Sequence, residues 1–224
     1  MQSIAKAFAI SAFAAGAVGQ SCPNIHIFGA RETTAPAGYG TGGEFIDLIL
    51  NAYSGATAEA IDYPAQGDGL YASSVQQGTK NIASQINSFN TKCPDSKLVV
   101  VGYSQGAQIG DNALCGGGDP NQGISDTKAL LTSSASAAVK AIIWAGNPRN
   151  SPVEKSAFGH GSCTASGFDP RPSGFSCSIF QARIRSYCDA ADPYCCNGSD
   201  AAAHQAYGQV YGQDALTFVK SKLG

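Results

Sequence analysis

Short apolar runs alternate along this chain with longer segments that have helical spacing. The runs typical of buried strands are residues 25–28, 58–63, 98–102, 139–145 and 182–187. The segments that can form helices are residues 43–53, 75–89, 107–114 and 207–223. Because strands and helices alternate, the pattern predicts an α/β fold with one central parallel sheet of about five strands and helices on both faces.

The carboxyl ends of three predicted strands lead into polar segments. Residues 31–33 follow the first strand, Ser104 follows the third, and residues 188–204 follow the fifth. In open parallel sheets, ligands bind beyond the carboxyl ends of the strands. We therefore expect the functional site at this edge of the sheet.

A G-x-S-x-G motif follows the third predicted strand, as Gly102, Tyr103, Ser104, Gln105 and Gly106. Between a strand and a helix, this motif turns sharply and lifts the serine hydroxyl above the sheet. Glycine at the two outer positions avoids clashes with neighbouring backbone. The alternative is an ordinary glycine-rich turn with a capping serine. We interpret Ser104 as a nucleophile.

The first nineteen residues have the pattern of a secretory signal peptide. Residues 1–6 carry one positive charge, residues 7–18 are small and apolar, and residues 17–19 fit a small-x-small cleavage site. The apolar run is about 12 residues long, and a membrane-spanning helix needs roughly 20. We expect cleavage after Gly19, a secreted, extracellular protein, and one catalytic domain over residues 20–224.

The charge balance argues against nucleic acid as a partner. The full chain has a formal charge of −2, which becomes −3 without Lys6, and only 13% of its residues are charged. The chain has no run of like charges and no basic patch. We expect a monomer that binds neither nucleic acid nor a membrane.

Eight cysteines follow the predicted signal peptide, at positions Cys22, Cys93, Cys115, Cys163, Cys177, Cys188, Cys195 and Cys196. An even number in a secreted chain predicts four disulfides. Their spacing leaves 105 pairings open. Zinc sites favour C-x-x-C pairs or histidines at short spacing, whereas these cysteines are scattered. We therefore expect no metal.

A serine nucleophile needs a base, and the chain has three histidines. His26 lies inside the first predicted strand and is interpreted as structural. His160 and His204 both follow Ser104, as the order serine, acid, histidine requires. We favour His204, because it follows the fifth strand, has acids before it and a helix after it.

The acid that orients the imidazole has three local candidates, Asp189, Asp192 and Asp200. Asp200 can simply cap a turn. Asp189 and Asp192 both lie between Cys188 and Cys195, which would close a small loop if they pair. Spacing alone does not separate these two aspartates.

Several segments together resemble the fungal acetylxylan esterase and cutinase family of small serine esterases. They are residues 22–23, 29–34, 102–106, 115–120, 174–177, 186–198 and 204–205. The resemblance covers residues 21–224 and implies a single-domain, cutinase-like α/β-hydrolase without a cofactor.

The resemblance also implies site residues. The catalytic set would be Ser104, Asp192 and His204, and the oxyanion hole would use the backbone N–H groups of Gln105 and Thr33, with the Thr33 hydroxyl as a further donor. The implied disulfides are Cys22–Cys93, Cys115–Cys177, Cys163–Cys196 and Cys188–Cys195.

The resemblance implies an esterase that removes acetyl groups from acetylated xylan through an acyl-enzyme. The alternative is a cutinase-like esterase for longer aliphatic acyl esters, and an alternative of another class is a disulfide-rich binding protein with an inactive site. Tyr103, Tyr194 and Tyr207 lie near the expected groove in sequence and could stack on sugars. Independently, Asn197 begins an N-x-Ser sequon, so an N-glycan is expected there.

Overall fold

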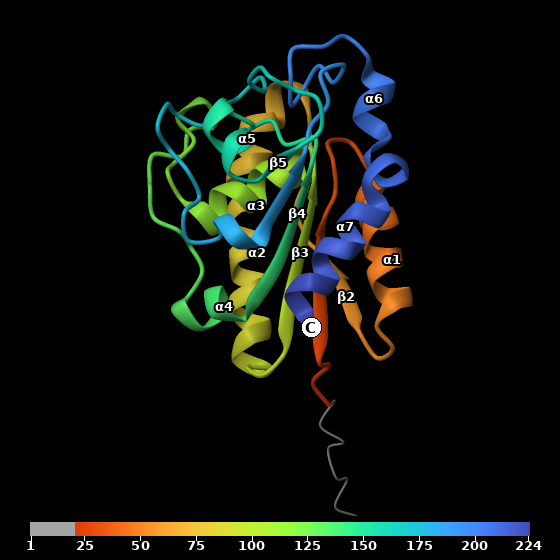
Figure 1. Ribbon diagram of the computed structural model, residues 1–224. Helices are drawn as coiled ribbons and strands as arrows, with labels where there is room; N and C mark the ends of the chain where they lie inside the picture. The colour runs from red at the N-terminus through yellow and green to blue at the C-terminus, as the bar shows by residue number, and fades with distance from the viewer. Residues whose placement is uncertain (1–20) are drawn as a thin grey trace, which may run out of the picture.

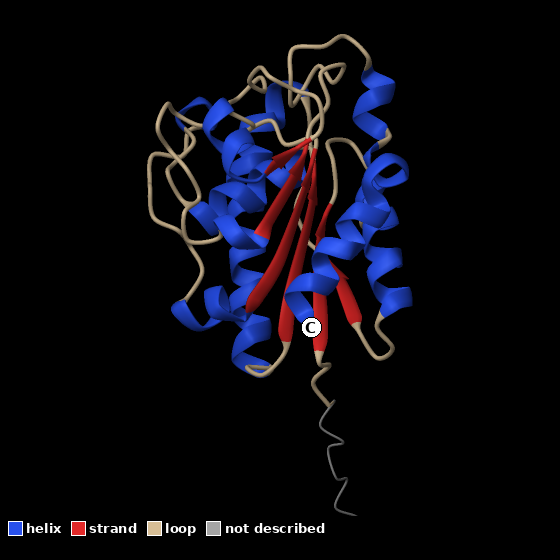
Figure 2. Cartoon of the chain, in the orientation of Figure 1, coloured by secondary structure: helices blue, strands red, loops and turns tan. Residues whose placement is uncertain are grey.

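The six strands of the protein form one sheet in which every neighbouring pair is parallel (Figure 2). The computed structural model describes residues 21–224, and this count applies to that part of the chain. In the order β2-β1-β3-β4-β6-β5, the strands are Thr57–Ala60, Ile25–Ala30, Lys97–Tyr103, Val139–Ala145, Ile184–Tyr187 and Gly159–His160. The order places β3, which leads to Ser104, in the interior of the sheet.

Helices cover both faces of the sheet (Figure 1). One layer holds α1 (Gly43–Ala52) and α7 (Tyr207–Leu223). The other layer holds α2 (Tyr71–Lys92), α3 (Gln105–Cys115), α4 (Ser133–Ala138) and α5 (Pro152–Phe158). The short α6 (Ala201–Gln205) lies near the carboxyl ends of the strands.

The strands are apolar on both sides because both sides are covered by helices. Successive side chains of a strand point to opposite faces. Phe28 and Val100 accordingly belong to the core under α2 and α3. Their chain neighbours Ile27 and Val99 belong to the core under α1 and α7. The predicted parallel α/β fold with helices on both faces is confirmed.

The predicted elements differ from the structure at their ends and at short segments that were missed. The helix predicted over residues 75–89 extends over residues 71–92 as α2. The runs at residues 139–145 and 207–223 match β4 and α7 residue for residue, whereas the second strand ends at Ala60 instead of residue 63. A sixth strand, β5, was not predicted, because two residues carry no periodicity. It contains His160, which lies outside every predicted strand and helix.

Helix α5 was also missed, although its capping signal is present in the sequence. Ser151 precedes Pro152, the first helical residue, and its Oγ accepts a hydrogen bond from Glu154 N at 3.3 Å. Serine at the cap followed by proline is a common helix start.

Four disulfides join segments within residues 21–224. They are Cys22–Cys93, Cys115–Cys177, Cys163–Cys196 and Cys188–Cys195, the pairs that the resemblance implies. The last of these encloses a loop of the chain that contains Asp192.

A buried ionic cluster lies where loops leave the carboxyl ends of the strands. Arg171 Nη2 is 2.9 Å from Asp111 Oδ1, and Arg149 Nη1 is 3.0 Å from Asp119 Oδ1. All four side chains are buried. Removing one member of such a pair leaves an uncompensated charge and costs about 3–5 kcal/mol. The cluster thus fixes the loops on which one side of the site is built.

The described helices include none that is both long enough and apolar enough to cross a bilayer. The expected signal peptide falls outside residues 21–224, so its cleavage after Gly19 stays a prediction.

The first turn of α3 packs directly against the end of β1. A Cβ at Gly106 would stand 2.1 Å from Ala30 O and 2.6 Å from Arg31 O. Backbone atoms of another element cannot move aside as a flexible side chain can. Only glycine therefore allows this approach of helix and strand.

We expect Gly106→Ala to destabilise the fold, because overpacking against backbone costs roughly 1–3 kcal/mol. For a domain of this size, each kcal/mol lowers the unfolding midpoint by about 2–4 °C. Gly69→Ala is the matched control, since its Cβ would meet nothing within 4 Å. Thermal unfolding by circular dichroism measures both, and equal midpoints for the two variants would contradict the packing argument.

Candidate active site

Ser104 occupies a strained turn between β3 and α3. Its φ of 52° and ψ of −119° lie in a region that non-glycine residues rarely adopt. Such strain costs about 1–3 kcal/mol and must be held by the surrounding structure. Ser104 N donates to Ala145 O at 2.8 Å, and Ala107 N donates to Ser104 O at 2.9 Å. Strand β4 and helix α3 together therefore hold the serine in place.

His204, near the end of α6, is tied to the carboxylate of Asp192. His204 Nδ1 lies 2.6 Å from Asp192 Oδ2, and both side chains are buried. Tyr103 OH donates to His204 O at 2.6 Å, which anchors the backbone of α6 to the end of β3. With Nδ1 occupied by the carboxylate, Nε2 is the ring nitrogen left to accept a proton.

Gly146, directly after β4, leaves room for the imidazole. Its φ is +61°, and a Cβ there would stand 2.6 Å from His204 Cε1 and 2.8 Å from His204 Nδ1. In the sequence, Gly146 is simply the residue that follows the predicted strand at residues 139–145. The structure shows that it also packs directly against the imidazole ring of His204.

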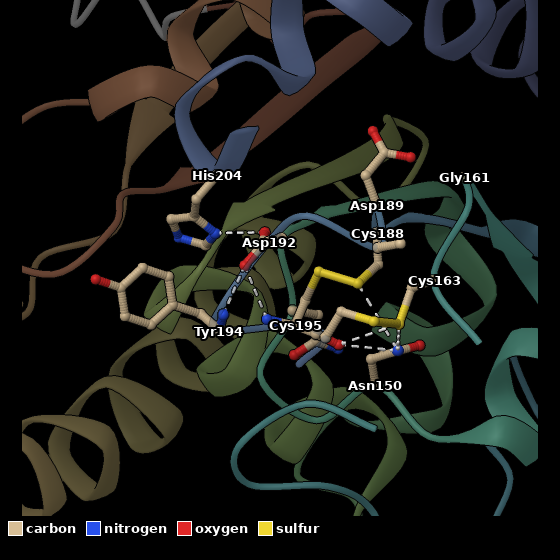
Figure 3. Close-up of a disulfide and its surroundings, with 12 residues drawn as sticks. Asn150, Gly161, Cys163, Cys188, Asp189, Asp192, Tyr194, Cys195 and His204 are labelled. Atoms are coloured by element: carbon tan, nitrogen blue, oxygen red, sulfur yellow. Dashed lines mark hydrogen bonds and ion pairs between the residues drawn. A yellow bond between two sulfur atoms is a disulfide. The ribbon is translucent and has the colours of Figure 1, made fainter. Parts of the chain in front are cut away.

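Asp192 is buried and accepts hydrogen bonds at both oxygens (Figure 3). Oδ1 accepts from Tyr194 N at 2.6 Å and from Cys195 N at 3.1 Å. Oδ2 accepts from Tyr207 OH at 2.7 Å. Burial by itself raises the pKa of Asp192. The hydrogen bonds from His204, Tyr194 N and Tyr207, with the charge of His204, outweigh burial and hold that pKa below its usual range.

Tyr207 is a supporting residue whose contact the sequence did not indicate. Its hydroxyl donates to Asp192 and accepts a hydrogen bond from Asp189 N at 2.9 Å. Burial and the charge of Asp192 both raise the pKa of Tyr207, so it keeps its proton for this bond. An aromatic residue at the start of a helix looks like an ordinary core residue in a sequence.

The structure distinguishes the aspartates that spacing left open. Asp189 Oδ1 accepts from Ser162 N at 3.0 Å and from Tyr211 OH at 2.8 Å. Figure 3 shows its carboxylate away from the imidazole. Asp200 Oδ1 caps α6 by accepting from Ala202 N at 2.9 Å. Asp192 is the one of the three that contacts His204 within residues 21–224.

The other two histidines, His26 and His160, lie in strands of the sheet and not beside Asp192. His26 lies in β1 with Nδ1 2.6 Å from Thr57 Oγ1, as its structural interpretation requires. His160 lies in β5 at the edge of the sheet. Burial lowers the pKa of His26 to about 4, so its ring is neutral in the core.

Ser104 and His204 face the same open cavity of about 820 Å³. Its lining residues come from loops after several strands and are Glu32, Thr33, Thr34, Gly67, Asp68, Tyr71, Ser104, Phe168, Pro193, Tyr194, His204 and Gln205. Of the three tyrosines that could stack on sugars, Tyr194 lines this cavity and is 43% exposed, whereas Tyr103 and Tyr207 are buried.

Thr33 and Gln105 lie together beside the serine. Gln105 Nε2 is 3.3 Å from Thr33 Oγ1 and 2.9 Å from Gln66 O. Since Thr33 Oγ1 accepts this bond, its own proton is available to donate toward the cavity. The N–H groups of Gln105 and Gly106, the first two residues of α3, have no acceptor within the helix and carry partial positive charge. This end of the cavity can therefore bind an anion.

Asn197 is exposed, in the segment between Asp192 and α6. The position is open to a glycan, and its glycosylation stays a prediction.

Comparison with known proteins gives consistent results. A family model described as Cutinase matches residues 21–223. Acetylxylan esterase 2 of Talaromyces purpureogenus is 56% identical, over 92% of this chain and 89% of that protein. Cutinase 11 of Verticillium dahliae is 57% identical, over 91% of this chain and 70% of that protein. The solved catalytic core domain of acetyl xylan esterase from Trichoderma reesei superposes with a TM-score of 0.87 at 53% identity, covering 90% of this chain and all of that one.

We expect Gly146→Ala to slow the labelling of Ser104 by a fluorophosphonate about 100-fold, because a misplacement of about 1 Å costs that much in reactivity. The added Cβ would displace His204, which the sequence predicts to be the base for Ser104. Gly174→Ala is the matched control, since Gly174 also has a positive φ, +82°, but a Cβ there would meet nothing within 4 Å. Equal labelling rates for the two variants would show that the space at Gly146 does not determine the position of the His204 ring.

The lowered pKa of Asp192 predicts a pH dependence of stability. The folded state holds this pKa below the ordinary value of 3.8, so between the two values the unfolded chain binds more protons. The resulting stabilisation is complete above about pH 4 and is lost as the pH falls through the folded-state pKa. We therefore expect the difference in unfolding free energy between wild type and Asp192→Asn to shrink on acidification, in urea titrations from about pH 6 down to pH 2. A difference that is constant over this range would refute the assignment.

Proposed function

The chain belongs to the cutinase family of ester hydrolases, and from this premise we propose that it is a secreted serine esterase that removes acetyl groups from acetylated xylan. The single observation that carries the proposal is that Ser104 and His204 face one cavity while Asp192 is buried behind the imidazole. The proposed substrate follows from two relatives named as acetylxylan esterases, which are 56% and 53% identical to this chain over most of its length.

In the proposed reaction, Ser104 Oγ attacks the acetyl carbonyl carbon while His204 Nε2 takes the hydroxyl proton. Asp192 holds the ring in the tautomer with the proton on Nδ1 and stabilises the imidazolium that forms. The tetrahedral intermediate collapses when the sugar oxygen leaves with the proton from Nε2. Water, deprotonated by His204 Nε2, then attacks the acetyl-serine. Ser104 Oγ leaves with that proton from Nε2, which releases acetate and restores the free enzyme.

The developing oxyanion would be bound at the start of α3. The proposed donors are the backbone N–H groups of Gln105 and Thr33 and the Thr33 hydroxyl. Their support is the contact between Gln105 Nε2 and Thr33 Oγ1, which turns the hydroxyl proton of Thr33 away from Gln105. Losing one donor of this kind costs about 2.7–4 kcal/mol of transition-state stabilisation.

Secretion is part of the proposal. Four disulfides are typical of proteins that fold in an oxidising compartment. The leader pattern of residues 1–19 agrees with this route. The mature domain would then begin at Gln20, with Asn197 as its site for an N-glycan.

A second candidate is an esterase for longer aliphatic acyl esters. Phe168 lines the cavity although half of its surface is exposed, which offers an apolar contact for an alkyl chain. The relative Cutinase 11 is as similar to this chain as the acetylxylan esterases are.

We expect the protein to release acetate from acetylated xylan and to hydrolyse p-nitrophenyl acetate with higher kcat/KM than p-nitrophenyl decanoate. Ser104→Ala should lower kcat roughly 10⁶-fold, because the nucleophile is lost. Its unfolding midpoint serves as the control for an intact fold. A preference for the decanoate ester would favour the second candidate, and undiminished turnover by Ser104→Ala would refute both.

A further inference from the structure

Glu32 places a negative charge in the cavity wall, one residue before Thr33. Thr41 N lies 3.1 Å from Glu32 Oε1 and 3.0 Å from Oε2, and Thr41 Oγ1 donates to Oε1 at 2.7 Å. Gly40 has a φ of +55°, and a Cβ there would stand 2.1 Å from Glu32 Oε2. The loop therefore closes tightly on the carboxylate and holds it in one place.

A carboxylate here acts against the proposed reaction. Negative charge develops on the carbonyl oxygen beside Thr33, and a nearby anion repels it. The field of Glu32 also reaches the end of β3, where it adds to burial in raising the pKa of Tyr103. The oxyanion alone gives no reason for an acid at this position, and the contacts with Thr41 leave part of the carboxylate's hydrogen-bonding capacity unused.

The carboxylate still has hydrogen-bonding capacity toward the cavity. Its two oxygens can accept about four bonds. Thr41 makes two contacts with Oε1, whereas among residues 21–224 the contact of Oε2 is the shared N–H of Thr41. Thr41 Oγ1 also lies 2.9 Å from the side-chain amide of Gln205, which lines the same rim next to His204. The remaining acceptor capacity of Glu32 Oε2 is complementary to a substrate that brings a hydroxyl proton.

We propose that Glu32 accepts a hydrogen bond from a free hydroxyl group adjacent to the acetylated oxygen, and so selects esters of vicinal diols, such as partly acetylated sugars, over esters of simple alcohols. This inference rests on the proposed esterase function and deepens it. The contact is made on the alcohol side of the ester, so it does not depend on the length of the acyl chain.

The test compares two acetates that differ by one hydroxyl group, the monoacetate of trans-1,2-cyclohexanediol and cyclohexyl acetate. For each enzyme, the ratio of the two kcat/KM values is taken. A hydrogen bond to a charged group corresponds to a factor of about ten or more. We expect this ratio to be about ten-fold higher in wild type than in Glu32→Gln. The amide of the variant retains one oxygen for Thr41, and the intrinsic reactivity of the two esters cancels in the comparison.

Asp68→Asn is the matched control, because Asp68 is the other carboxylate among the lining residues of this cavity. Its ratio should equal that of wild type. The inference is overturned if Glu32→Gln keeps the wild-type ratio, or if Asp68→Asn lowers the ratio as much, which would reveal a general charge effect.

Wild type alone provides a second measurement in case Glu32→Gln does not fold. Its ratio, divided by the ratio of the hydroxide-catalysed rates of the two esters, should be about ten. A normalised ratio of one, with both esters hydrolysed, overturns this inference and leaves the esterase function standing. No hydrolysis of either ester overturns both.

Discussion

The close approach of α3 to the end of β1 is the constraint on which the site depends. Gly106 lets the first turn of the helix lie against the carbonyl groups of Ala30 and Arg31. That contact places Ser104 at the end of β3 and the loop that begins after β1 next to each other. Ser104 and both groups of proposed oxyanion donors are therefore positioned by backbone packing, as preorganised donors require.

The imidazole is positioned by a second, independent arrangement. Asp192 lies in a loop closed by the Cys188–Cys195 disulfide, and the side chain of Tyr207 meets it from α7. The carboxylate is buried, yet hydrogen bonds at both oxygens keep it charged. A buried charge that is fully hydrogen-bonded cannot reorient without losing several bonds at once. The hydrogen bond to Asp192 thus fixes the orientation of the His204 ring, which lies on the short helix α6.

Long periodic segments could be predicted from the sequence, and the contacts of single side chains could not. The periodicity of residues 207–223 is carried by a whole helix face, so α7 was predicted to the residue. Asp189 and Asp192 share one short loop, and only the hydrogen bond to His204 tells them apart. The roles of Gly146 and Tyr207 depend on contacts with residues far away in the sequence. The two-residue strand β5 is stabilised by pairing with β6 alone, which leaves no trace in its own residues.

The polar groups that complete the site come from distant parts of the chain. Ser104 belongs to the first half, whereas Asp192 and His204 belong to the last thirty-three residues, in a segment joined to the rest by Cys163–Cys196. During synthesis, Ser104 is therefore made well before the residues that are proposed to activate it. The proposed hydrolytic activity requires that residues 192–204 have been made and have folded against the ends of the earlier strands.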